Sequence, residues 1–146
     1  MHISTKCSVA LHCLVFIHEY GEATRVTSQL LAKSTGVNPV TIRTILSALK
    51  KAGIIDVRAG TGGTTLVQDP AEITVLRVTE ALEPDFLAKL IGVHASPSEL
   101  CPVGRSIHEV LDRTYEQVRE DMRRSLERIT LADVLDAYSH VEGATS

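Results

Sequence analysis

Basic and hydroxyl side chains recur three or four residues apart between positions 38 and 51. On a helix, this spacing places them on one face and leaves the apolar side chains between them on the opposite face. Arginine can donate two hydrogen bonds to guanine, serine and threonine can bond any base edge, and lysine suits a phosphate. The pattern therefore predicts a helix that reads the DNA major groove, with candidate contacts from Thr41, Arg43, Thr44, Ser47 and Lys50.

Another basic side chain, Arg58, stands immediately before the glycine-rich run 59–63. Short β-prone runs at 54–58 and 64–67 flank it and predict a hairpin with a flexible tip. It is not a phosphate-binding loop, because it joins two strands and lacks the Gly-Lys-Ser/Thr ending. An arginine there favours a narrow, strongly negative minor groove, so the further candidate DNA contacts are Arg58, Gly60, Gly62 and Gly63.

Helix start and stop signals place these side chains in a helix-turn-helix. Thr27 is a candidate N-cap of a short helix, and Gly36 ends that helix because glycine adopts the left-handed conformation. Asn38 is a good N-cap, Pro39 suits the first helical position, and Gly53 follows the last turn. With the hairpin, this order predicts a winged helix-turn-helix, and Thr27, Asn38 and Pro39 join the candidate DNA contacts.

The remaining elements are predicted to be helical. One helix spans 4–20, and another begins at Thr74. A long helix from about 103 to 128 carries apolar residues three or four apart, which suits packing against a partner helix. Thr130 and Asp133 have the spacing of a capping box that starts a last short helix.

The expected fold class is mainly α with a small β-hairpin wing and a long dimerisation helix. We expect residues 1–70 to form the DNA-binding domain. Residues 71–139 would then form a helical region for dimerisation and sensing, and residues 140–146 a flexible tail.

Charge separates the two halves of this 146-residue chain, whose composition of 44% apolar and 23% charged residues is that of a globular protein. The net charge is −3. Residues 1–69 hold seven Lys/Arg and four Asp/Glu, a net +3, whereas residues 70–146 hold eight and fourteen, a net −6. Local charge decides partner choice, so the basic first half favours double-stranded DNA. An aromatic content of 3% disfavours base stacking on single strands.

The chain has three cysteines, Cys7, Cys13 and Cys101. A disulfide framework normally uses a larger, even number, so none is expected here. This predicts a reducing, cytoplasmic location. The N-terminal segment does not have the features of a signal peptide, and no apolar run of about 18 residues could span a membrane. Cys7 lies on the apolar face of the first predicted helix, and Cys13 lies off it.

Cys101 has two interpretations that the sequence leaves open. It precedes Pro102 at a helix start, where the helix dipole favours a thiolate, so it is a candidate oxidant or electrophile sensor. It could equally be an inert N-cap cysteine. Together with His94 and His108 it has spacings of seven and seven, which match no common zinc pattern, so no metal site is expected.

The combined motifs resemble the IscR/NsrR/CymR family (the Rrf-two family) of bacterial winged-helix regulators. The resemblance is closest to the YwnA-like branch, which has a single cysteine before the long helix. It covers nearly the whole chain and rests on the segments 30–43, 49–58, 60–63, 69–74, 101–104 and 130–133.

The resemblance implies a homodimer in which two long helices cross and two winged domains bind a palindromic operator, usually to repress. It also implies that Arg43 reads a base and that Arg58 enters the minor groove. Ser4, Thr5 and Lys6 fall where the first helix meets the phosphate backbone. Some members hold an iron–sulfur cluster through three cysteines before the long helix. This chain has one there, so no cofactor is expected.

Two other classes of function compete with a DNA-binding regulator. One is a small enzyme with Cys101 as nucleophile and His94 or His108 as base. It lacks an orienting acid, an oxyanion loop and a second domain, so no enzyme is expected. The other is a winged-helix module used only for protein contacts, which substitution of Arg43 and Arg58 would distinguish.

Overall fold

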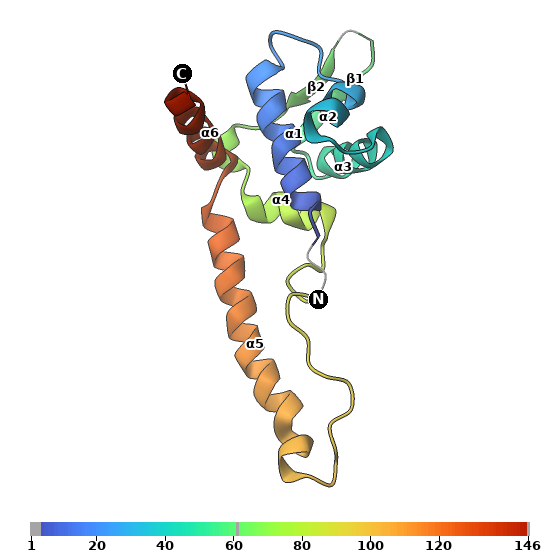
Figure 1. The fold of residues 1–146 in the computed structure, drawn as a ribbon, viewed down its shortest axis with the longest axis vertical. Coiled ribbons are helices and arrows are strands. Elements are labelled where there is room, and N and C mark those ends of the chain that lie inside the picture. Colours follow the sequence, from blue (N-terminus) through green and yellow to red (C-terminus); the bar gives the residue numbers. More distant parts are fainter. Residues whose placement is uncertain (1–3, 61, 146) are drawn as a thin grey trace.

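The computed structural model describes residues 4–60 and 62–145, and the last residue of the expected tail, Ser146, lies outside them. A winged helix-turn-helix head, made of residues 4–60, 62–82 and 131–145, sits at one end of a long helix (Figure 1). The elements run α1 (Lys6–Tyr20), α2 (Ser28–Thr35), α3 (Pro39–Lys51), β1 (Ile55–Arg58), β2 (Gly63–Leu66), the 3-10 turn η1 (Pro70–Glu72), α4 (Val75–Leu82), α5 (Pro102–Arg128) and α6 (Leu131–Thr145).

The predicted start and stop signals of the helix-turn-helix are confirmed. The Thr27 side chain accepts a hydrogen bond from Leu30 N at 3.2 Å, and Gly36 takes the left-handed conformation with φ 71°. Asn38 Oδ1 accepts from Val40 N at 2.8 Å, and Pro39 occupies the first turn of α3. These residues satisfy backbone groups that a helix end would otherwise leave unpaired.

The wing is an antiparallel hairpin of β1 and β2, paired from Ile55 with Leu66 to Arg58 with Gly63. The segment before α2 adds to it, because Thr64 N donates to Val26 O at 3.0 Å. Val26 and Ile55, the first residue of β1, are both buried, and Ile54 N donates to Leu49 O of α3 at 3.0 Å. The wing is therefore fastened both to α2 and to the end of α3.

The core of the head surrounds α1, which contacts α2, α3, α4, α6 and β2. Because these elements cover more than one side of α1, Cys13 is fully buried. The prediction that Cys13 lies off the buried face is therefore wrong. Cys7 is half-buried, and its sulfur lies 3.2 Å from Thr79 Oγ1.

The core does not stop at residue 70. Ile73 and Val78, on or before α4, and Leu131 and Leu135 on α6 belong to the same buried cluster as α1, α2 and α3. Two backbone bonds join the starts of α4 and α6: Val75 N donates to Ile129 O at 2.8 Å, and Leu131 N to Ile73 O at 2.7 Å. A domain boundary at residue 70 therefore does not follow the packing.

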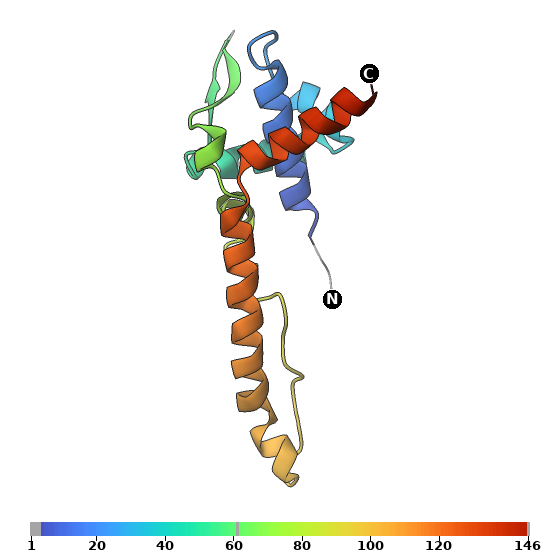
Figure 2. The same cartoon turned by 90° about the vertical axis from the view of Figure 1, so that its left-hand side faces the viewer.

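The last helix is longer than predicted. α6 crosses α1 (Figure 2) and continues to Thr145, so the expected tail 140–146 is helical as far as that residue. His140 Nδ1 and Thr145 Oγ1 bond backbone carbonyls one turn earlier, those of Asp136 and Val141. The predicted capping box starts this helix, since Thr130 N donates to Asp133 Oδ2 at 2.8 Å.

Helix α5 projects away from the head, with the extended segment 84–101 beside it (Figures 1 and 2). Arg119 Nη2 donates to Ile91 O at 3.1 Å, and His108 Nε2 lies 2.7 Å from His94 O. Gly104 lies against Ser98, whose carbonyl oxygen would be 2.1 Å from a side-chain carbon there. These contacts hold the segment along the helix, yet no residue of α5 is buried.

Candidate nucleic-acid interface

Helix α3 separates its two faces as predicted. Ile42, Ile45, Leu46 and Leu49 are buried against the head. The five predicted contact residues on the opposite side are all exposed, namely Thr41, Arg43, Thr44, Ser47 and Lys50. Thr44 Oγ1 donates to Val40 O at 3.1 Å, so its free lone pairs can act as acceptors.

A groove of about 380 Å³ runs between α3 and the wing, and we call it the basic groove. Arg43, Ser47 and Lys50 line it from α3, and Arg58 lines it from β1. Thr27 and Gly63 also line it, together with Arg25, Ser28 and Thr64. Four cations, separated in sequence by up to 33 residues, therefore face one concave surface.

Arg25 and Ser28 belong to this surface but were not predicted as contacts. Arg25 contributed only to the positive charge of the first half. The Val26 to Thr64 bond brings Arg25 beside the wing, and no local spacing signals such a pairing. Ser28 is the first residue of α2, where its position follows from the Thr27 cap.

The three wing glycines have different surroundings. Gly60 and Gly62 are exposed, and Gly60 has a left-handed φ of 75°. Gly63 is buried, with φ 65°, and an added Cβ would lie 2.9 Å from Arg25 Cγ and 3.0 Å from Val26 N. Gly63 therefore seats the wing on the Arg25 segment, a packing role that adds to its place in the groove lining.

Arg58 extends into solvent from the wing, with 73% of its side chain exposed. Its Nε lies 3.7 Å from Asp56 Oδ2, an exposed pair of the kind worth about 0–1 kcal/mol. Asp56 is also bonded by Val57 N at 2.9 Å. Such a weak pair leaves Arg58 able to exchange Asp56 for a phosphate or a base.

The three candidate contacts at the start of α1, Ser4, Thr5 and Lys6, lie outside the lining of the basic groove. Ser4 Oγ accepts from Lys6 N at 3.2 Å, whereas Thr5, the N-cap by position, makes no side-chain capping bond. Thr5 and Lys6 are exposed. Asn38, Pro39, Thr41 and Thr44 also lie outside that lining, at the exposed start of α3.

Arg77 on α4 connects the end of α3 to the segment that leaves the wing. Its Nη2 donates to Ala52 O at 3.0 Å, and Ala52 is the C-cap of α3. Its Nη1 donates to Gln68 Oε1 and, at 3.4 Å, to Glu72 O. The planar guanidinium thus holds three chain segments in one arrangement.

Cys101 is the exposed N-cap residue of α5, with no side-chain capping bond. His94 and His108 contact each other instead, edge to face at 5.6 Å between ring centroids. Cys13 differs, because burial raises the pKa of its thiol to about 11 and keeps it protonated. Of the two, Cys101 is the thiol that solvent reaches.

A helix-turn-helix with a hairpin wing and a concave basic surface defines a winged-helix protein. Residues 3–137 match the model of the Rrf2 family, described as iron-dependent transcriptional regulators. The chain is 37% identical to the HTH-type transcriptional regulator YwnA of Bacillus subtilis, over 92% of this chain and 97% of YwnA. This chain therefore belongs to the Rrf2 family of transcriptional regulators.

Solved structures agree with this fold. A crystal structure described as a DNA-binding protein has a TM-score of 0.70 at 35% identity, covering 89% of this chain and 98% of its own. A transcriptional regulator from Lactobacillus plantarum has a TM-score of 0.78 at 27% identity, covering 94% and 92%. The winged-helix architecture with its long helix is thus shared with these relatives.

The family description implies iron, so the ligand set of this chain matters. Iron–sulfur clusters are held by about four protein ligands, mostly thiolates. Here Cys7 lies against Thr79, Cys13 is buried in the head, and Cys101 begins α5. Within residues 4–60 and 62–145, no three His, Cys, Asp or Glu side chains gather as a metal site. The cysteines of this chain do not fit such a cluster.

Proposed function

We propose that this protein is a homodimeric, sequence-specific DNA-binding regulator that represses from a palindromic operator. The basic groove carries the proposal. Arg43 and Lys50 line it from the exposed side of α3, and Arg25 and Arg58 line it from the wing side. A major groove admits such a helix, and a phosphate backbone attracts the flanking cations. The relatives named as transcriptional regulators support the same function.

The DNA contacts we propose are those predicted from the sequence, with Arg25 and Ser28 added. Arg43 would read a base edge and Arg58 would enter the minor groove, while Lys50 and Arg25 would bind phosphate. Lys6, with Ser4 and Thr5, would meet the backbone from α1. The absence of a metal or cofactor is part of the proposal, and rests on the scattered positions of the cysteines.

The experiment is selection of bound duplexes from a random pool, followed by binding measurements on the selected operator. Arg43→Ala and Arg58→Ala should each weaken operator binding by about 1–3 kcal/mol, roughly 5- to 150-fold. Arg113→Ala is the matched control, since Arg113 is an exposed arginine on α5 that lies outside the basic groove and pairs with Glu109. If both groove variants bind as well as the unsubstituted protein, the groove does not read DNA and a protein-contact module becomes the better assignment.

Dimerisation is proposed through α5. Val103, Val110 and Val118 on this helix are 66%, 55% and 38% exposed, although they repeat at a spacing that suits a helix seam. Val110→Asp should convert the dimer to a monomer in sedimentation, because a carboxylate in an apolar seam is costly. Asp112→Asn, on the same helix, is the control. A sedimentation coefficient unchanged by Val110→Asp would place the dimer interface elsewhere.

A thiol response is the last part of the proposal, and Cys101 carries it. Its exposure and position at the start of α5 suit oxidation, whereas Cys13 is shielded. Peroxide should release the operator from the unsubstituted protein and from the Cys13→Ala variant, but not from Cys101→Ser. Release that persists in Cys101→Ser would assign the response to another group.

The family places this chain among transcriptional regulators rather than enzymes. Within the part of the chain that the structure describes, no helix is long and apolar enough to cross a membrane.

A further inference from the structure

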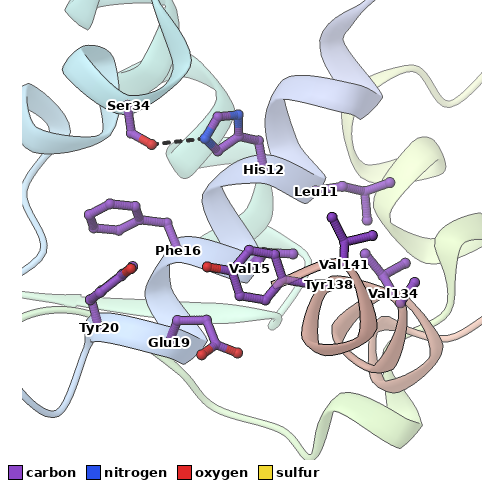
Figure 3. A pocket seen from close by; sticks show the side chains of 11 residues that line it. Leu11, His12, Val15, Phe16, Glu19, Tyr20, Ser34, Val134, Tyr138 and Val141 are labelled. Carbon is purple, nitrogen blue, oxygen red and sulfur yellow. Dashed lines mark hydrogen bonds between the residues drawn. The ribbon is translucent and has the colours of Figure 1, made fainter. Parts of the chain in front are cut away.

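A second cavity, of about 760 Å³, lies between α1 and α6 (Figure 3). Leu11, Val15 and Phe16 of α1 form one side, and Val134 and Val141 of α6 form the other. It shares no lining residue with the basic groove. Its volume falls within the range of about 300–1,000 Å³ that small-molecule sites occupy, and its walls are largely apolar, as such sites usually are. We call it the α1–α6 pocket.

One end of this pocket is aromatic and acidic. The Phe16 and Tyr20 rings lie 4.9 Å apart between centroids, tilted by 43°. The Tyr138 hydroxyl points toward Tyr20, and the Glu19 carboxylate lies beside them (Figure 3). His18 Nδ1 contacts Glu19 at 3.4 Å, from a side chain that is 43% exposed.

The electrostatic field at this end is negative. Interaction with the Tyr20 hydroxyl raises the pKa of Tyr138, burial raises it further, and the carboxylates of Glu142 and Glu19 add to the rise. No lysine or arginine is among the described residues that line the pocket. A negatively charged ligand would therefore meet the Glu19 carboxylate, whereas a cation would meet that carboxylate and three aromatic rings.

We propose that the α1–α6 pocket binds a small organic cation with an apolar body. The aliphatic walls would cover the body, and Phe16, Tyr20 and Tyr138 would attract the charge through their ring faces. Glu19 would pair with the charge directly. This combination of aromatic faces and one carboxylate discriminates a cation from a neutral or anionic molecule of the same shape.

The pocket also borders the helix-turn-helix. His12 Nε2, on its wall, lies 2.8 Å from Ser34 Oγ near the end of α2 (Figure 3). A ligand that displaces His12 would alter the contact between α1 and α2. Coupling of the cation to operator release rests on the proposed function, and it requires that the ligand bind the free and DNA-bound forms with different affinity.

Titration calorimetry on the full chain without DNA tests the site. Tetraphenylphosphonium and tetraphenylborate have nearly the same shape and opposite charge, so they form a matched pair of probes. The cation should bind about tenfold or more tightly than the anion, the ratio expected from one ring-face and one carboxylate contact. Equal affinity, or tighter binding of the anion, would overturn the proposal.

Two variants locate the binding. Glu19→Gln should weaken the phosphonium about fivefold to tenfold and leave the borate unchanged or tighter. Ala137→Trp, at an exposed lining position on α6, should fill the pocket and abolish binding of both probes. Ser139→Trp is the matched control, because Ser139 is an exposed α6 residue outside the lining. Thermal melting confirms that each variant folds.

Three results would contradict the assignment. Unchanged phosphonium binding in Glu19→Gln would remove the carboxylate from the site, and this test does not depend on the tryptophan variant folding. Unchanged binding in a folded Ala137→Trp would place the probe elsewhere. Conversion of the dimer to a monomer by Ala137→Trp, but not by Ser139→Trp, would assign the pocket to a second copy of the chain.

A separate measurement tests the coupling. Saturating phosphonium should weaken binding of the selected operator, and less so in Glu19→Gln. If the phosphonium binds but leaves operator affinity unchanged, the site stands and its regulatory role fails. If no operator is found, the proposed function fails while the calorimetric result still decides the site.

Discussion

The head and the long helix α5 differ in where their stability comes from. The head buries complete aliphatic side chains, among them Leu14, Leu31 and Leu49, contributed by α1, α2 and α3. α5 is the longest helix of the structure and buries none of its residues. Helices in proteins are stabilised mainly by packing of an apolar face, which is why we propose that α5 packs against a second copy of the chain. The head buries its apolar side chains within one chain, whereas α5 does not.

The largest predicted effect is on the stability of the head. Leu14→Ala removes a side chain with 0% exposure and should lower the free energy of unfolding by about 2–5 kcal/mol. Val110→Ala on α5 is the comparison variant, since Val110 is 55% exposed. It should leave the free energy of unfolding of the head unchanged and alter only how unfolding depends on protein concentration. Urea denaturation at two protein concentrations measures both, and similar losses in the two variants would contradict the distinction.

The next largest effect concerns Arg77, which links the end of α3 to the segment that follows β2. Arg77→Ala removes hydrogen bonds to Ala52 O, Gln68 and Glu72 O, and should cost about 1–3 kcal/mol. Arg77→Lys keeps the charge but not the planar fork, so it should recover only part of this. Arg113→Ala on α5 should cost under about 0.5 kcal/mol in the same denaturation series. An Arg77→Ala variant as stable as Arg113→Ala would mean that the Arg77 hydrogen bonds do not stabilise the contact between these segments.

A smaller effect concerns the joint between α5 and α6. Asp133→Ala removes the capping-box acceptor of Thr130 N and should cost about 0.5–1 kcal/mol. Asp136→Ala, an exposed α6 residue outside the box, is the control. Hydrogen exchange should rise in the first turn of α6 in Asp133→Ala alone. Equal exchange in the two variants would argue against the box.

The smallest effect is the pH response of α5. The hydrogen bond from Arg123 lowers the pKa of Glu120 from 4.5 to about 2, with Arg124 adding to it. A carboxyl whose pKa is lower in the folded state stabilises that state above its unfolded pKa. This contribution is therefore present above about pH 4.5 and is lost as the pH falls toward 2. Helix content followed by circular dichroism should fall less steeply over this range in Glu120→Gln than in the unsubstituted protein.

Much of the helix-turn-helix could be predicted from the sequence because its signals are local. Thr27, Asn38 and Thr130 act on backbone groups two or three residues away, and Gly36 acts through its own backbone conformation. The alternation of buried and exposed residues along α3 follows from helical periodicity alone. Such features do not depend on what the element packs against.

The sequence by itself therefore determined the caps, the turn, the exposed face of α3 and the glycine-rich tip. Only the tertiary structure decided that Val26 pairs with Thr64, which brings Arg25 to the basic groove, and that neighbours on several sides bury Cys13. It also decided that α6 returns across α1 and forms the second pocket. The physical reason is distance along the chain, since these contacts join residues 38 or more positions apart or depend on several elements at once. Periodicity and capping signals report only on neighbours within about one helical turn.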